Sequence, residues 1–219
     1  MIAVIVPIYN TEKYLRETID SVICQTLSFA EHIRLILLDD ASTDGSFAIC
    51  EQYQKQYPKQ IVVKHYDTNQ GVSALRNEGV RIAGEMGDEL ITFLDSDDKL
   101  ADDAVEKAKM YFESHEDISV AAIAVKYFGT RDGEQRLNWR FQEMDVVDIK
   151  KQYTFPHYYV GGVFLRKRVL NELHFDETMN FWEDALAINQ VIVSEGKYGL
   201  IQDTFYFYRK REDESSLVD

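Results

Sequence analysis

The chain has 219 residues, 45% of them hydrophobic, which suits one domain with a substantial core. Its 38 acidic and 24 basic residues give a formal net charge of −14. This charge disfavours nonspecific binding to nucleic acid, whose phosphates attract basic surfaces. No apolar run approaches the roughly 18–20 residues of a membrane span, and the N-terminus lacks the basic segment and cleavage site of a signal peptide. We therefore expect a cytoplasmic protein and leave peripheral membrane contact open.

Short apolar segments alternate with helical patterns along the first 115 residues. We expect strands at 2–6, 33–38, 61–66 and 90–94, followed in turn by helices at 11–25, 46–57, 71–86 and 101–115. The apolar segments are almost continuously hydrophobic, which is typical of strands covered on both faces in a parallel sheet. The pattern predicts an α/β fold, with an open, mostly parallel sheet and helices on both faces.

The second half of the chain is less regular. One or two strands are expected at 118–128, a polar loop at 129–155, short helices at 166–175 and 183–196, and closing strands at 198–209. This order breaks the alternation of strand and helix. We expect the second half to form a flank or lid on the same domain.

Polar clusters follow three of the expected strands. They are PIYN (7–10) after the first strand, DDASTDG (39–45) after the second and DSDD (95–98) after the fourth. In open parallel sheets, ligands bind beyond the carboxyl ends of the strands. Segments far apart in the sequence are therefore expected to meet at one edge of the sheet and form a binding site.

The DSDD cluster places Asp95, Asp97 and Asp98 directly after an apolar strand. Crowded carboxylates repel one another unless a cation lies among them. Oxygen ligands suit Mg²⁺ or Mn²⁺, which is usually held by one or two carboxylates together with substrate phosphates. The cluster predicts a divalent cation completed by a phosphorylated substrate. The alternative is an ordinary polar loop after a buried strand.

Two other metal-dependent patterns fit less well. Phosphatases of the haloacid dehalogenase type place Asp-x-Asp after their first strand, where this chain has the carboxylate-free segment 7–10. Residues 40–51 match several ligand positions of an EF-hand loop, yet a helix should precede such a loop and 33–39 has a buried strand's pattern. A turn in which Ser42 or Thr43 caps the following helix is the simpler interpretation.

Two later stretches carry complementary charges. Glu183 and Asp184 follow the aromatic pair 181–182, so a general base could lie beside rings that stack on a sugar; alternatively, both are acids favoured in a first helical turn. The basic residues 209–211 could neutralise a diphosphate, or be solvated at a strand end. The basic residues 166–168 are expected to flank a helix, with contact to an acceptor or anionic lipid less favoured.

The chain resembles the family 2 glycosyltransferases of the GT-A fold in four motifs that occur in that family's order and spacing: VIVPIYN (4–10), LLDDASTDGS (37–46), NQGVSALRNEG (69–79) and LDSDD (94–98). A single motif would carry little weight, but four in order are specific. The resemblance continues through the segments around 161–170, 181–190 and 208–211. It implies a Rossmann-like single domain over 1–219, with a nucleotide-binding half at 1–100 and a smaller acceptor-side half at 101–219.

The resemblance also implies roles for individual residues. Those expected to bind the nucleotide sugar are Pro7, Tyr9, Asp39, Asp40, Asn69, Arg76, Asp95, Ser96, Glu183 and Arg211. Asp97 would be the ligand of a divalent cation, Mn²⁺ or Mg²⁺, and Asp184 the catalytic base. Gly161 and Gly162 match a position where the backbone passes close to the sugars.

The implied activity is an inverting, metal-dependent transfer of a sugar from a nucleotide-diphospho-sugar, expected to be a UDP-hexose or UDP-N-acetylhexosamine. The acceptor would be a hydroxyl of a glycan, teichoic acid or lipid-linked molecule at the bacterial surface. Many relatives carry histidine where this chain has Arg211. The pattern here resembles enzymes of wall teichoic acid and capsule synthesis, in which an arginine contacts the diphosphate.

Two alternatives remain from the sequence. One is a catalytically idle nucleotide-sugar-binding module of a larger polymer-synthesis protein, although such a module need not keep the Asp-x-Asp motif and the Glu-Asp pair. The other is a nucleotidyltransferase, which usually has a glycine-rich loop after the first strand, where this chain has PIYNTEKY (7–14). A further interpretation is an excised catalytic domain of a longer protein, with further domains or a homo-oligomer as partners.

Overall fold

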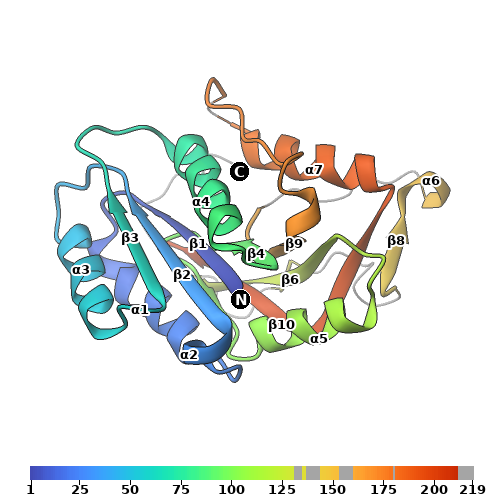
Figure 1. The fold of residues 1–219 in the computed structure, drawn as a ribbon, viewed down its shortest axis with the longest axis horizontal. Helices are drawn as coiled ribbons and strands as arrows, with labels where there is room; N and C mark the ends of the chain where they lie inside the picture. Colours follow the sequence, from blue (N-terminus) through green and yellow to red (C-terminus); the bar gives the residue numbers. More distant parts are fainter. Residues whose placement is uncertain (131–134, 137–143, 153–159, 180, 212–219) are drawn as a thin grey trace.

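The computed structural model describes residues 1–130, 135–136, 144–152, 160–179 and 181–211. Its strands form one mixed sheet with the order β3-β2-β1-β4-β9-β6-β10-β5 (Figure 1), while β7 pairs with β6 and β8 with β10. Helices cover both faces. The predicted α/β fold is confirmed, and the sheet runs without a break from the first half of the chain into the second.

The first half of the sheet is parallel, as predicted. Its strands are β1 (Ile2–Ile8), β2 (Ile33–Asp39), β3 (Ile61–His65) and β4 (Leu90–Phe93), with β1 between β2 and β4. The helices of this half are α1 (Glu12–Ile23), α2 (Phe29–His32), α3 (Ser46–Gln56) and α4 (Val72–Met86). The carboxyl ends of β1, β2 and β4 consequently lie at the same edge of the sheet.

The second half interrupts this parallel order. Its elements are β5 (Lys99–Leu100), α5 (Ala104–Ser114), β6 (Val120–Gly129), β7 (Gln135–Arg136), β8 (Val146–Asp148), α6 (Ile149–Gln152), β9 (Val163–Arg166), a 3₁₀ turn (Lys167–Val169), α7 (Glu183–Glu195) and β10 (Lys197–Lys210). Strand β9 runs antiparallel to both β4 and β6, and β6 runs parallel to β10. The helix predicted at 166–175 is wrong, because this segment contains the end of β9 and only one 3₁₀ turn.

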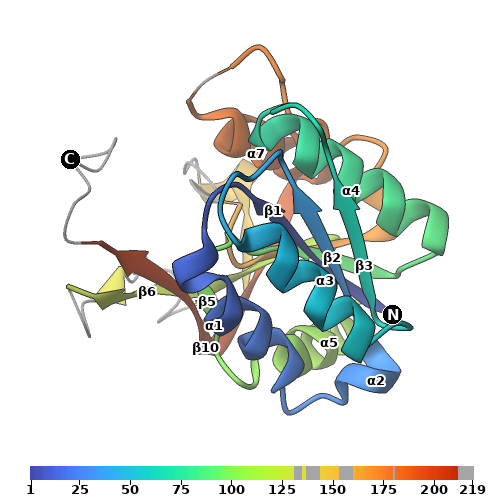
Figure 2. The ribbon, with the colours of Figure 1, turned by 90° about the vertical axis from the view of Figure 1, so that its left-hand side faces the viewer.

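Helices α1, α3 and α5 lie on one face of the sheet and α4 and α7 on the other (Figure 2), and alternate residues of β1 face these two layers. Val4 and Val6 pack in a cluster with side chains of α1, α3 and α5, whereas Ala3 and Ile5 pack in another with side chains of α4 and α7. Helix α4 lies very close to β1, since a Cβ added at Gly79 would stand 2.3 Å from Cγ2 of Ile5. The glycine thus sets the height of α4 above the strand that leads to the polar edge.

The basic segment 166–168 has a structural role. Arg166 donates to the backbone oxygens of Phe112 and Ile118, and Arg168 donates to that of Glu116. These carbonyls lie in the last turn of α5 and in the loop after it, where helix carbonyls lack intrahelical partners. Both arginines therefore anchor α5 to β9. None of the helices within the described ranges is long and apolar enough to cross a membrane.

Candidate functional site

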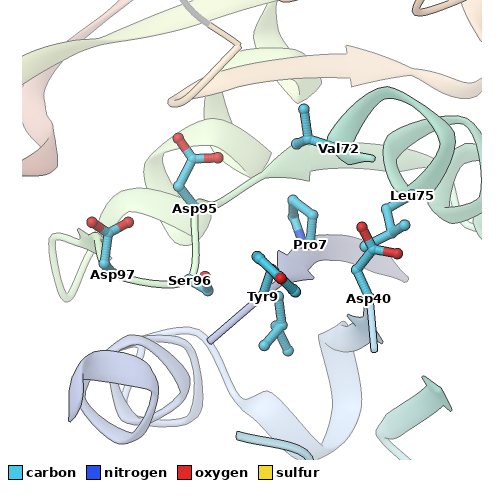
Figure 3. A pocket seen from close by; sticks show the side chains of 9 residues that line it. Pro7, Tyr9, Asp40, Val72, Leu75, Asp95, Ser96 and Asp97 are labelled. Atoms are coloured by element: carbon cyan, nitrogen blue, oxygen red, sulfur yellow. The ribbon is translucent and has the colours of Figure 1, made fainter. Parts of the chain in front are cut away.

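A pocket opens at the carboxyl ends of β1, β2 and β4 (Figure 3). The residues that line it are Pro7, Ile8, Tyr9, Asp40, Val72, Leu75, Asp95, Ser96 and Asp97. Asp40 and Asp95 stand on opposite sides of the pocket with Pro7 and Tyr9 between them, and Asp97 lies farther along the loop from Asp95. The three predicted polar clusters therefore meet at one edge of the sheet.

Reciprocal hydrogen bonds join the loop after β1 to the loop after β2. The backbone N–H of Asn10 donates to Oγ of Ser42 over 3.0 Å, and the side-chain oxygen of Asn10 accepts from the N–H of Thr43 over 2.8 Å. Asn10 has φ 51°, a left-handed conformation that asparagine adopts more readily than most residues. One carboxylate oxygen of Asp44 accepts from the N–H of Glu12 and the other from that of Ser46. These hydrogen bonds hold the loop after β1, which contains Tyr9, against the loop after β2.

The structure has bends at 41 and 43–45, in the segment interpreted as a turn, but the predicted cap is wrong. Ser42 and Thr43 bond to Asn10, whereas Asp44 accepts the N–H of Ser46, the first residue of α3. The segment before this loop is strand β2, not the helix that an EF-hand requires. Asp44, which stands at a ligand position of the EF-hand pattern, accepts the backbone N–H groups of Glu12 and Ser46.

Asp39, the last residue of β2, and Asp40, which follows it, point in opposite directions, as successive residues of a strand do. Asp40 lines the pocket, and its two oxygens accept the N–H groups of Gln70 and Gly71 over 2.6 and 2.9 Å, which fixes the start of α4. Asp39 is fully buried, lies 2.7 Å from Nδ1 of His65 and does not line the pocket. Asp39 therefore connects the end of β2 to the end of β3 through His65 and does not face the pocket.

The loop 95–98 is held from β10. Tyr206, which is 1% exposed, donates its hydroxyl to Asp98 over 2.7 Å and accepts the backbone N–H of Asp95 over 3.2 Å. The backbone N–H of Arg209 donates to the other oxygen of Asp98 over 2.7 Å. Burial, followed by the charges of Asp97 and Asp95, raises the pKa of Asp98 well above its ordinary value. Asp98 thus orders the loop from within the core, while Asp95 and Asp97 face the pocket.

Gly161 makes room for Tyr206. A Cβ at Gly161 would stand 2.7 Å from Cζ of the tyrosine ring, and one at Gly162 would stand 3.0 Å from its Cβ. Both glycines were predicted to lie where the backbone passes close to sugars. In the structure, their lack of side chains admits the ring that holds the loop 95–98.

We expect Tyr206→Phe to destabilise the fold, because it removes the hydroxyl that donates to buried Asp98. A buried polar group left without its hydrogen-bond partner costs about 1–3 kcal/mol. Urea unfolding measures this change. Tyr14→Phe is the control, because its ring faces Arg209 and Arg211 at 4.7 and 4.8 Å and keeps these contacts without the hydroxyl. Equal stability of Tyr206→Phe and the wild type would contradict this role.

Basic side chains from the end of β10 reach the same loop. The guanidinium of Arg211 forms an ion pair with the carboxylate of Asp97, and Nε of Arg209 donates to the backbone oxygen of Asp97 over 2.6 Å. Burial and the neighbouring charge of Asp95 raise the pKa of Asp97, and Arg211 opposes this rise. A cationic group thus already lies among the clustered carboxylates.

The donor set at Asp97 fits a hard cation only in part. Within the described ranges, no group of three His, Cys, Asp or Glu side chains is arranged to hold a metal ion. Magnesium-like ions commonly use one or two carboxylates and take their other ligands from water and substrate phosphates. Asp97, which lines the pocket, fits such an ion if phosphate oxygens complete the site.

The Glu-Asp pair is joined to the pocket through Arg76. This arginine is 5% exposed, and its guanidinium lies 3.0 Å from Oε1 of Glu183 and 3.3 Å from Oδ1 of Asp95. It also lies over the ring of Phe175, 5.6 Å from the centroid. Because Arg76 belongs to α4, it connects the first residue of α7 to a residue that lines the pocket.

Asp184 is held at the start of α7. Its carboxylate oxygens accept the N–H of Ala185 over 2.7 Å and that of Val160 over 3.3 Å. Burial raises the pKa of Asp184 above its ordinary value, whereas the charge of Arg76 lowers it. A carboxylate with a raised pKa, fixed in position beside a pocket, can accept a proton from a bound hydroxyl group.

The family model for glycosyl transferase family 2 matches residues 3–174. The chain belongs to this family. The family 2 chain is 41% identical over 221 residues to the minor teichoic acid biosynthesis protein GgaA of Bacillus subtilis (strain 168), covering 100% of the chain and 49% of that protein. It is 39% identical to GgaB of the same organism, covering 99% of the chain and 24% of that protein. The chain thus spans half or less of the length of these relatives.

Solved structures share the fold of this family 2 chain. S. aureus TarS in complex with UDP-GlcNAc superposes with a TM-score of 0.78 at 24% identity, covering 97% of this chain and 59% of that one. The mannosyltransferase PcManGT of Pyrobaculum calidifontis, in complex with GDP-Man and Mn²⁺, gives 0.71 at 17% identity, covering 97% and 57%. The predicted GT-A fold is confirmed.

The structure gathers most of the residues predicted for the family 2 site. Pro7, Tyr9, Asp40, Asp95, Ser96 and Asp97 line the pocket. Arg76, Glu183 and Arg211 contact pocket aspartates or one another, and the side-chain amide of Asn69 donates to the backbone oxygen of Asp40 over 3.4 Å. Ile8, Val72 and Leu75 also line the pocket and were missed. Val72 and Leu75 lie three positions apart in the quoted motif at the start of α4, where adjacent turns present one face.

Proposed function

We propose that the chain transfers a sugar from a UDP-sugar to a hydroxyl of a teichoic-acid-like or other surface glycan, with inversion at the anomeric carbon. The ion pairs of Arg76 carry this proposal, because they join Asp95 in the pocket to the residue before Asp184. A candidate base is thus tied to a pocket suited to a donor. The names of GgaA and GgaB support the acceptor class, and the UDP-GlcNAc complex of TarS supports the donor class.

In the proposed reaction, Asp184 takes the proton of the acceptor hydroxyl as that oxygen attacks the anomeric carbon from the face opposite the diphosphate. The bond from the anomeric carbon to the diphosphate oxygen breaks, and the leaving diphosphate keeps the electron pair. Arg211, beside Asp97, is placed to neutralise this charge. Asp97 would hold the divalent cation, which would supply further charge neutralisation when bound. Such electrostatic stabilisation often exceeds the effect of a general base.

We assign roles to the remaining site residues from their positions in and around the pocket. Pro7, Tyr9 and Asp40 would enclose the uracil, with Asn69 behind Asp40 and Asp39 bracing the strand end. Asp95 and Ser96 would face the ribose and the sugar. This division makes 1–100 the donor half and 101–219 the acceptor half of one domain. These roles are proposed for the 219 residues of this chain and not for the full length of its relatives. We also propose a cytoplasmic site of action with peripheral membrane contact.

We expect UDP together with Mn²⁺ to raise the melting temperature of the protein, because a ligand that binds only the folded state stabilises it. At about 100 times its dissociation constant, a ligand adds roughly 2.7 kcal/mol, or about 5–11 °C for a chain of this size. Differential scanning fluorimetry with UDP, ADP, GDP and CDP, each with and without Mn²⁺, measures the effect. A flat response to every nucleotide would contradict the proposed donor site.

Turnover separates an enzyme from the idle binding module. A panel of UDP-sugars is incubated with the protein and Mn²⁺, with and without teichoic acid polymers, and released UDP is measured. We expect UDP release that depends on one donor. Stabilisation by UDP without release from any donor would favour the idle module.

A further inference from the structure

Large apolar side chains are exposed at the start of α7, beside the candidate base. Phe181 and Trp182 are 55% and 59% exposed, and Leu186, one turn later, is 41% exposed. In the described part of the chain, nine large hydrophobic side chains are exposed, and these three fall within residues 181–186. Single exposed apolar residues are ordinary, but a group of them marks an interaction site.

The backbone of Trp182 has an uncommon conformation. Its φ of 65° and ψ of 10° lie in the left-handed region, which bulky side chains seldom adopt. Trp182 is also the N-cap of α7, a position where serine, threonine, aspartate, asparagine and glycine are preferred. Neither local conformation nor capping therefore explains a tryptophan here. Residues in sparsely populated conformations gather at ligand sites, where the surrounding structure holds them in place.

The residue that follows this aromatic pair connects it to α4, two residues of which line the donor pocket. Glu183, which follows Trp182, is bound by Arg76 of α4. Val72 lies one turn before Arg76 on the same helix, lines the pocket and is 41% exposed. Figure 1 shows the start of α7 beside α4. The pair thus lies close to α4 and the donor pocket, with Trp182 two positions and Phe181 three positions before Asp184, the residue that would receive the acceptor's proton.

We propose that Phe181 and Trp182 form an acceptor subsite that binds the C–H face of a neutral sugar ring. The proposal rests on the proposed transferase function. An aromatic ring offers a flat apolar surface with a negative face, which suits the partly positive C–H groups of a pyranose. The neighbouring carboxylates of Glu183, Asp184 and Asp95 disfavour a phosphate at the same place. The subsite therefore selects the glycosyl part of an acceptor over its phosphodiester part.

Saturation-transfer NMR tests the subsite on the purified chain in the presence of UDP and Mn²⁺. Two probes are titrated separately, methyl β-D-glucopyranoside as a neutral ring and ribitol 5-phosphate as a phosphorylated alditol. We expect saturable transfer to the C–H protons of the glucoside. Trp182→Ala and Phe181→Ala should weaken its binding roughly 2–10-fold, the range of one aromatic contact. Trp182→Tyr should retain binding because it keeps a ring.

Val193→Ala is the matched control, because Val193 is 61% exposed on the same helix but three turns from Trp182. Glucoside binding that is absent in the wild type, or equal in the wild type, Trp182→Ala and Phe181→Ala, would overturn the proposal. Binding of ribitol 5-phosphate in place of the glucoside would overturn it as well. If Trp182→Ala also lowers the melting temperature, glucoside binding by Trp182→Tyr is the deciding measurement: retained binding supports the proposal and lost binding overturns it. Failure of the transferase proposal is a separate result: UDP then does not stabilise the wild type.

Discussion

Replacement of Asp184 with asparagine is expected to lower the rate of sugar transfer by about 10²–10⁴-fold, the contribution of a positioned general base. The amide keeps the size of the carboxylate and one oxygen to accept the N–H of Ala185 over 2.7 Å, and gives up only the longer contact of 3.3 Å with the N–H of Val160. It cannot take a proton from an acceptor hydroxyl. Initial rates of UDP release in the presence of acceptor measure the loss.

Nucleotide binding separates this chemical defect from a folding defect. Asp184 does not line the pocket, so Asp184→Asn should keep the melting-temperature shift that UDP and Mn²⁺ produce in the wild type. Asp176→Asn is the matched control, because Asp176 is an acid before α7 whose carboxylate accepts the N–H and hydroxyl of Thr178. Normal turnover by Asp184→Asn would remove Asp184 from the role of base.

Local sequence patterns predicted the parallel half of the fold well. The segment 33–38 is apolar except for Arg34 because β2 lies between two strands and under helices on both faces, so its environment can be predicted from its own residues. The segment 166–175 misled the prediction. Its apolar residues have helical spacing, but its start belongs to β9, which pairs with β4 and β6 from distant parts of the chain. Such pairing is set by tertiary contacts and leaves no local periodicity.

The site shows the same division between local motif and distant contact. The motif residues Asp40, Asp95 and Asp97 could be placed from the sequence, since strand ends of a parallel sheet converge. The opposite orientation of Asp39 could also have been read from the alternation of strand side chains. Tyr206, however, reaches Asp98 across 108 positions, and its apolar neighbours resemble an ordinary strand. A buried tyrosine that organises an acidic loop has no sequence signature of its own.

Arg76→Met is expected to impair transfer most strongly at low pH. Burial raises the pKa of Asp184, Arg76 lowers it, and the charges of Glu183 and Asp95 raise it. A base acts in its ionised form, so transfer falls as the pH drops through this pKa. Without Arg76 the pKa of Asp184 rises further, and the acid limb of the pH–rate profile moves to higher pH. Initial rates across the acid range, compared with the wild type, measure the shift.

Stability and a conservative variant distinguish positioning from simple structural support. Removal of one partner of a fully buried ion pair costs about 3–5 kcal/mol. The side chain of Asp95 is 37% exposed, so Arg76→Met should fall at or below the lower end of this range. Arg76→Lys keeps the charge but not the two-armed geometry, and should restore most of the pH profile while leaving the rate reduced. Arg76 would be structural support alone if the methionine variant lost stability yet kept the wild-type pH profile, because the charge next to Asp184 would then have no effect on the proton transfer.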